Sequence, residues 1–197
     1  MPALPFNQCG LSDTYHWLHE AREQLLSCTS GRGRKALLRQ DLSIVLKIAS
    51  YDIVFQDVPG EVTLSLNLSQ CPNCCPGCHS PGLQDDIGYP LDDDMLDGLL
   101  ERYGRDVTCV CFMGGDREPE EVMRLADRVH GIGLKTAWYS GRQELPDCFR
   151  KESLDYVKVG PYIESKGPLP NPNTNQRMYR IDQGNLIDIT SSFIKKR

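Results

Sequence analysis

The stretch Glu61–Cys78 reads EVTLSLNLSQCPNCCPGC and joins an apolar run to a cysteine-rich loop. The run EVTLSLNLS is typical of a strand. The preceding stretch YDIVFQDV, residues 51–58, indicates another strand, and Pro59-Gly60 indicates the turn between the two. The chain therefore places four cysteines directly after a strand, on a loop that proline and glycine break.

Helical and strand patterns alternate after this loop. Leu91–Gly104 predicts a helix with an acidic first turn that ends at Gly104. Pro119–Gly131 predicts a second helix, which begins at the proline and buries a stripe of apolar residues. The stretches DVTCVCFM, LKTAWYSG and LDYVKVG predict three further strands. Such alternation indicates an α/β fold with a mostly parallel sheet, and the length allows only an incomplete (β/α) barrel.

The N-terminal residues differ from this α/β pattern. Helical periodicity from about residue 13 to 28 and again from 36 to 48 predicts a helical N-terminal extension over residues 1–43. We find no chemical motif in it and assign it no role. Residues 44–197 form the expected α/β domain.

Composition restricts the class of protein. The net charge of −5 argues against nucleic acid or a membrane surface as partner. The sequence holds no apolar run long enough for a membrane span, and its first ten residues lack the features of a signal peptide. We expect a cytoplasmic protein. Because cytosolic thiols stay reduced, its nine cysteines favour metal binding or reactivity over disulfides.

The cysteine loop allows two interpretations. Cys71-x2-Cys74 beside Cys75-x2-Cys78 resembles two zinc half-sites, but a zinc ribbon separates such pairs by many residues. The other spacing, Cys71-x3-Cys75-x2-Cys78, suits three ligands of a [4Fe–4S] cluster and leaves Cys74 over. Three cysteines leave one iron free for substrate.

Other unusual residues also follow strands. Gly114-Gly115-Asp116, the Tyr139–Gly141 turn and GPYI at residues 160–163 each come after a predicted strand. Carboxyl ends of parallel strands meet at one edge of a sheet, where such folds bind ligands. We therefore expect these loops to meet the cysteine loop there.

The segments NLSQCPNCCPGCHSPGLQ, FMGGDREPEE, KTAWYSG and DYVKVGPYIESKGPL…NTNQRMYRI together carry a family resemblance. Over about residues 45–181 the chain resembles the activating proteins of anaerobic ribonucleoside-triphosphate reductase, in the radical S-adenosylmethionine (SAM) superfamily. The resemblance implies an incomplete barrel of the radical SAM type. It also implies that Cys71, Cys75 and Cys78 hold a [4Fe–4S] cluster. The implied SAM contacts are Gly77, Cys78, His79, Gly114, Gly115 and Asp116.

The resemblance further implies a radical reaction. One electron, from a reduced flavodoxin or ferredoxin, cleaves SAM into methionine and a 5′-deoxyadenosyl radical. That radical takes a hydrogen atom from a glycine of the reductase large subunit. No side chain acts as a general base in this scheme, which fits the lack of a hydrolytic motif in the sequence.

Several alternatives remain open at this level. The chain resembles activases of other glycyl-radical enzymes and other small radical SAM enzymes in its cysteine spacing, and a non-catalytic zinc-binding module is the alternative of another class. Asp116 is read alternatively as a helix cap. Cys74 has no assigned role. The TNQR segment, residues 174–177, either pairs along the sheet or faces a partner or cofactor.

Overall fold

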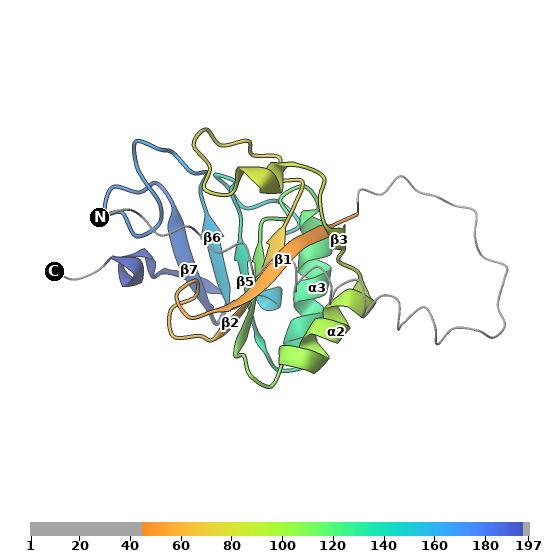
Figure 1. Ribbon diagram of the computed structural model, residues 1–197. Helices are drawn as coiled ribbons and strands as arrows, with labels where there is room; N and C mark the ends of the chain where they lie inside the picture. The colour runs from red at the N-terminus through yellow and green to blue at the C-terminus, as the bar shows by residue number, and fades with distance from the viewer. Residues whose placement is uncertain (1–44, 195–197) are drawn as a thin grey trace, which may run out of the picture. The chain divides into compact units, whose positions relative to one another are not determined.

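The computed structural model describes residues 45–194. An eight-stranded sheet in the order β3-β1-β2-β4-β5-β6-β7-β8 forms its centre (Figure 1). The strands are β1 Lys47–Val54, β2 Thr63–Leu68, β3 Tyr89–Pro90, β4 Cys109–Met113, β5 Lys135–Tyr139, β6 Tyr156–Val159, β7 Arg177–Asp182 and β8 Asn185–Asp188. The predicted helical extension, residues 1–43, lies outside the described residues.

The expected incomplete (β/α) barrel with a mostly parallel sheet is wrong. Only the central pairs β2–β4, β4–β5 and β5–β6 are parallel. The pairs β1–β2, β1–β3, β6–β7 and β7–β8 are antiparallel, so the sheet is mixed. Only two α-helices occur within residues 45–194. Antiparallel neighbours need only a turn or loop between them, whereas parallel strands need a crossover, and residues 45–194 supply only two α-helices for crossovers.

The two helices match their sequence signals. Helix α2, Asp93–Tyr103, begins where the Asp92 side chain accepts a hydrogen bond from the Met95 backbone N–H, and it ends at Gly104. Helix α3, Pro119–Gly131, begins at the predicted proline. Its buried residues include the whole predicted stripe, Val122, Leu125, Ala126 and Val129. The helix predictions are therefore confirmed.

Both helices cover the same face of the sheet. This face carries Leu64, Leu66 and Leu68 of β2, all fully buried. Gly115 is enclosed between Val122 of α3 and Leu68, which puts α3 on the leucine face. In α2 the ring of Tyr103 packs 5.5 Å from that of Tyr51 on β1, and Tyr51 lies opposite Leu66 in the sheet register. Figure 1 shows the two helices side by side, and Arg128 of α3 pairs with Asp97 of α2.

The opposite face has a smaller core. Cys109, Cys111, Ala137, Tyr156 and Met178 project from it and pack with two residues from loops, Val58 and Leu169. Cys109 and Cys111 are fully buried and act as small core residues. Burial raises the pKa of both thiols, so they stay neutral.

The amino ends of the parallel strands are joined by one buried carboxylate. Glu61 is 7% exposed and accepts hydrogen bonds from Lys135 Nζ (2.5 Å), Thr108 Oγ1 (2.7 Å) and Tyr156 OH (2.8 Å). Lys135 and Tyr156 are the first residues of β5 and β6, and Thr108 directly precedes β4. Burial alone favours the neutral acid, but the three donors prevail and lower the pKa of Glu61.

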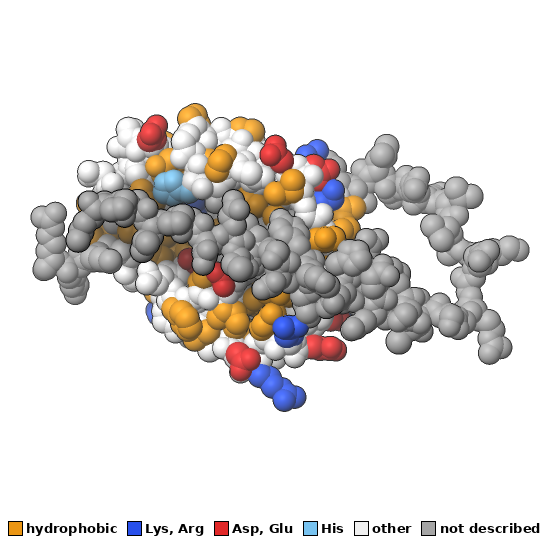
Figure 2. All heavy atoms as spheres, in the orientation of Figure 1, with side chains coloured by type: hydrophobic (Ala, Val, Ile, Leu, Met, Phe, Trp, Pro, Cys, Tyr) orange, Lys and Arg blue, Asp and Glu red, His pale blue; other side chains and the backbone are white. Residues whose placement is uncertain are grey.

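In the view of Figure 2, acidic and basic side chains of the described residues are scattered among hydrophobic ones, and neither sign of charge forms a continuous patch. Neither described helix combines the length and the apolar character that crossing a bilayer requires.

Candidate functional site

A row of four side chains forms the floor of a cavity at the carboxyl edge of the parallel strands. Asn67, Met113, Tyr139 and Lys158 lie opposite one another in register across β2, β4, β5 and β6. Residues in register share a face of the sheet. All four line a cavity of about 240 Å³ on the face opposite α2 and α3. The expected meeting place of the loops is therefore present, although the fold around it differs from the expected barrel.

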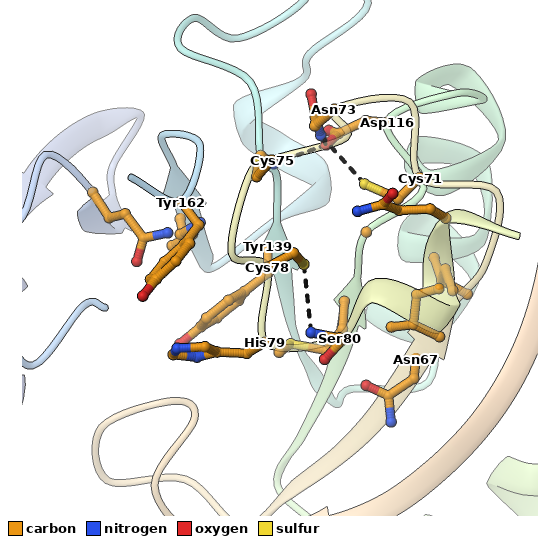
Figure 3. A pocket seen from close by; sticks show the side chains of 18 of the residues that line it. Asn67, Cys71, Asn73, Cys75, Cys78, His79, Ser80, Asp116, Tyr139 and Tyr162 are labelled. Atoms are coloured by element: carbon orange, nitrogen blue, oxygen red, sulfur yellow. Dashed lines mark hydrogen bonds between the residues drawn. The ribbon is translucent and has the colours of Figure 1, made fainter. Parts of the chain in front are cut away.

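The cysteine loop separates three of its thiols from the fourth. Cys71, Cys75 and Cys78 line the cavity, whereas Cys74 is exposed and does not (Figure 3). The Cys74 backbone has a positive φ of 43°, a conformation that residues other than glycine and asparagine rarely adopt. The Cys78 N–H donates to the Cys75 carbonyl at 3.1 Å, so the loop turns tightly between these two residues.

Asn73 connects this loop to the next strand end. Its Nδ2 lies 2.5 Å from Asp116 Oδ2 and 3.6 Å from Cys71 Sγ, and both bonds are drawn in Figure 3. One amide therefore holds a cavity-lining thiol and a buried carboxylate together. Burial raises the pKa of the Cys71 thiol, and the hydrogen bonds from Asn73 oppose this effect.

Asp116 is fully buried and lines the cavity, but protein donors occupy both of its carboxylate oxygens. Ser140 Oγ donates to Oδ1 at 2.6 Å, and the Gly141 N–H donates to Oδ2 at 2.8 Å beside the Asn73 bond. The N-cap position of α3 is Glu118, so the alternative reading of Asp116 as a helix cap does not hold. The carboxylate joins the cysteine loop, its own turn and the Tyr139–Gly141 turn.

The two glycines before Asp116 lie in different surroundings. Gly114 lines the cavity with a φ of 103°, and its carbonyl accepts from Trp138 Nε1 at 2.7 Å. Trp138 is fully buried, so this bond belongs to a packing residue of the core. Gly115 does not line the cavity. A Cβ there would lie 2.6 Å from Val122 Cγ2, so this glycine lets α3 approach the sheet.

The wall opposite the strands comes from two loops. The rings of His79 and Tyr162 lie 4.6 Å apart, and both line the cavity. Gly77 does not line the cavity, and a Cβ there would lie 3.4 Å from the Glu164 side chain. Of the predicted SAM contacts, the cavity therefore brings together Cys78, His79, Gly114 and Asp116, and it leaves out Gly77 and Gly115.

The TNQR segment contacts the loop that carries Tyr162. Asn175 Nδ2 donates to the Pro161 carbonyl at 2.9 Å, and the side chain of Gln176 lines the cavity. Arg177 begins β7, which pairs with both β6 and β8. Of the alternatives left open by the sequence, pairing within the sheet is therefore observed from Arg177 onward.

Lys158 is a cavity residue that sequence reasoning missed. It is 8% exposed, and its Nζ donates to the carbonyls of Gly160 (2.8 Å) and Ser140 (3.4 Å). Burial lowers its pKa to about 8, while the charges of Asp116 and the three cavity cysteines act in the opposite direction. The sequence did contain a signal for Lys158, because it is a single lysine inside the apolar strand DYVKV. Burying a charged side chain there destabilises the fold unless the charge has partners.

The donor set suits an iron–sulfur cluster. Thiolates are the usual ligands of such clusters, and three of them face one cavity. Within residues 45–194, no three His, Cys, Asp or Glu side chains converge on the position of a single metal ion. A cubane binds each cysteine through a different iron, so it does not need that convergence.

No family model, no curated protein and no solved structure matches this chain.

Proposed function

We propose that this protein is a radical SAM activase that generates the glycyl radical of anaerobic ribonucleoside-triphosphate reductase. The observation that carries the proposal is the separation of the thiols: Cys71, Cys75 and Cys78 line one cavity while Cys74 does not. This selection agrees with the x3-x2 spacing on which the family resemblance is based. It is also the selection that leaves a cluster with one corner free of protein.

In this proposal Cys71, Cys75 and Cys78 hold the [4Fe–4S] cluster, and SAM occupies the cavity beside it. When bound, the cluster and SAM supply one-electron cleavage of a sulfonium C–S bond and removal of a hydrogen atom from the partner's glycine. Gly114 offers backbone without a side chain at the cavity wall, which permits close approach of a ligand.

The remaining residues position the loops and restrict water. Asp116 and Asn73 fix the cysteine loop against the Tyr139–Gly141 turn. His79 and Tyr162 cover the ligand space with two rings. Such fixed surroundings matter because the cofactor carries the difficult chemistry and the protein's part is to hold it and exclude side reactions.

The proposed partners are the large subunit of the reductase and a reduced flavodoxin or ferredoxin as electron donor, in the cytoplasm. The mixed charge of the described surface in Figure 2 is compatible with protein partners.

Anaerobic reconstitution with iron and sulfide tests the proposal. We expect a brown protein with about four iron atoms per chain that releases 5′-deoxyadenosine from SAM under a strong reductant. Addition of the reductase should then give a glycyl-radical signal by electron paramagnetic resonance. Zinc in a colourless protein would overturn the proposal in favour of a binding module. Release of 5′-deoxyadenosine without a radical on this reductase would point to another glycyl-radical enzyme or another small radical SAM reaction.

A further inference from the structure

Lys158 carries a positive charge in the same cavity as the three thiols. It stands on β6, an inner strand of the sheet, directly opposite Tyr139 on β5 and Met178 on β7. Its register places it in the row that forms the cavity floor. Two carbonyl groups, from Gly160 and Ser140, hold its Nζ in place.

A buried ammonium needs compensation. Two neutral carbonyls offset part of the cost of removing a lysine from water, and negative charge in the same cavity offsets more. The Asp116 carboxylate lies in that cavity, but it is already bonded to Ser140, Gly141 and Asn73. The other potential anions lining the cavity with Lys158 are the thiolates of Cys71, Cys75 and Cys78.

The geometry points to Lys158 as a positioning residue of electrostatic function, whose fixed ammonium raises the reduction potential of the group bound by Cys71, Cys75 and Cys78. This inference rests on the proposed function, because it takes that group to be a [4Fe–4S] cluster. One electron from a reduced flavodoxin- or ferredoxin-class protein adds one negative charge to the cluster. A fixed positive charge in the same cavity stabilises this reduced state over the oxidised one, and net charge near a cluster is among the properties that set its potential.

The burial of Lys158 makes the effect strong. Charges interact more strongly in a partly buried cavity than at a hydrated surface, where water and salt screen them. The carbonyl bonds to Gly160 and Ser140 keep the ammonium from turning away when the cluster changes charge.

The experiment is a redox titration of the reconstituted full chain, followed by the electron paramagnetic resonance signal of the reduced cluster. Lys158→Met keeps the length of the side chain and removes the charge. We expect its one-electron reduction equilibrium to become about tenfold less favourable, which is about 59 mV more negative. Lys158→Arg, which keeps a positive charge, should stay nearer to the wild type. Lys158→Gln serves as a second neutral variant in case Lys158→Met does not fold.

Lys151→Met is the matched control. Lys151 is exposed and lies in the short helix Lys151–Ser153, before the amino end of β6. It does not line the cavity, so Lys151→Met removes the same charge at a place outside the proposed cluster site. We expect it to leave the potential unchanged. An unchanged potential in a folded, cluster-loaded Lys158→Met or Lys158→Gln protein would overturn the inference alone, even if SAM binding weakened. A wild-type chain that takes up no [4Fe–4S] cluster would overturn the proposed function and this inference with it.

Discussion

Asn73 and Asp116 lie 43 positions apart in the sequence, and Asn73 Nδ2 approaches Asp116 Oδ2 to 2.5 Å. The same amide nitrogen lies 3.6 Å from Cys71 Sγ. The cysteine loop is therefore fixed to the turn after β4 by a hydrogen bond between side chains from two segments that are far apart in the sequence. The position of a cavity-lining thiol depends on a carboxylate from another loop.

Removing that carboxylate should loosen the whole site. Asp116→Ala leaves Asn73, Ser140 and the Gly141 N–H without their acceptor in a buried place. We expect a loss of about 2–4 kcal/mol in the free energy of unfolding, measured by urea denaturation, and a lower iron content after reconstitution. Asp106→Ala, at an exposed turn, is the control and should change neither quantity. Normal stability and iron content in Asp116→Ala would show that the carboxylate does not organise the site.

The neighbours Cys74 and Cys75 provide a matched pair within the loop. Cys75 lines the cavity and Cys74 is exposed outside it. We expect Cys75→Ala to lose nearly all cluster absorbance after anaerobic reconstitution and Cys74→Ala to keep it. The measurement is iron and sulfide per chain together with the visible spectrum. Cluster loss in Cys74→Ala with retention in Cys75→Ala would reverse the assignment of the ligands.

The aromatic wall should contribute to SAM binding without affecting the cluster. His79 and Tyr162 both line the cavity, with their rings 4.6 Å apart, and packing of an aromatic ligand group against one such ring is worth about 0.5–1.5 kcal/mol. Tyr162→Ala should therefore raise the Kd for SAM about 3- to 10-fold in equilibrium binding to the reconstituted protein. The control is Phe55→Ala, which removes a ring that is 70% exposed. Equal affinity in the Tyr162→Ala protein would exclude this ring from the ligand site.

The Glu61 cluster predicts a pH-dependent stability. Because the folded protein lowers the pKa of Glu61 below its ordinary value of 4.5, the carboxylate stabilises the fold above that pH, and the contribution is lost as the pH falls through the folded pKa. At pH 7 we expect Glu61→Gln to lower the free energy of unfolding by about 2 kcal/mol. The difference from the wild type should shrink below pH 4.5, where the wild-type side chain becomes neutral as well.

Chemical denaturation at pH 7 and at several acid pH values measures this difference. Glu101→Gln on the exposed side of α2 is the control, with little effect at any pH. A gap between Glu61→Gln and the wild type that stays constant from pH 7 into the acid range would refute the linkage.

The two helices followed from local signals, and the direction of the outer strands did not. Asp92, Gly104 and Pro119 act on their own helix ends, so the sequence is sufficient to place them. The β7–β8 hairpin turns at Gln183-Gly184, where both residues have positive φ. Such a turn usually carries Asn-Gly or Asp-Gly, and glutamine gives only a weak signal for it. The mixed sheet was therefore missed.

The sequence alone determined which residue types follow which strands, and it selected Cys71, Cys75 and Cys78 by their spacing. Only the tertiary structure decided that Gly77 and Gly115 stand outside the cavity, that both Asp116 oxygens are taken, and that Lys158 joins the floor. The physical reason is that helix caps and strand ends depend on neighbours in the chain. Sheet register and the pairing of buried polar groups depend instead on segments far apart in the sequence, which meet only in the folded protein.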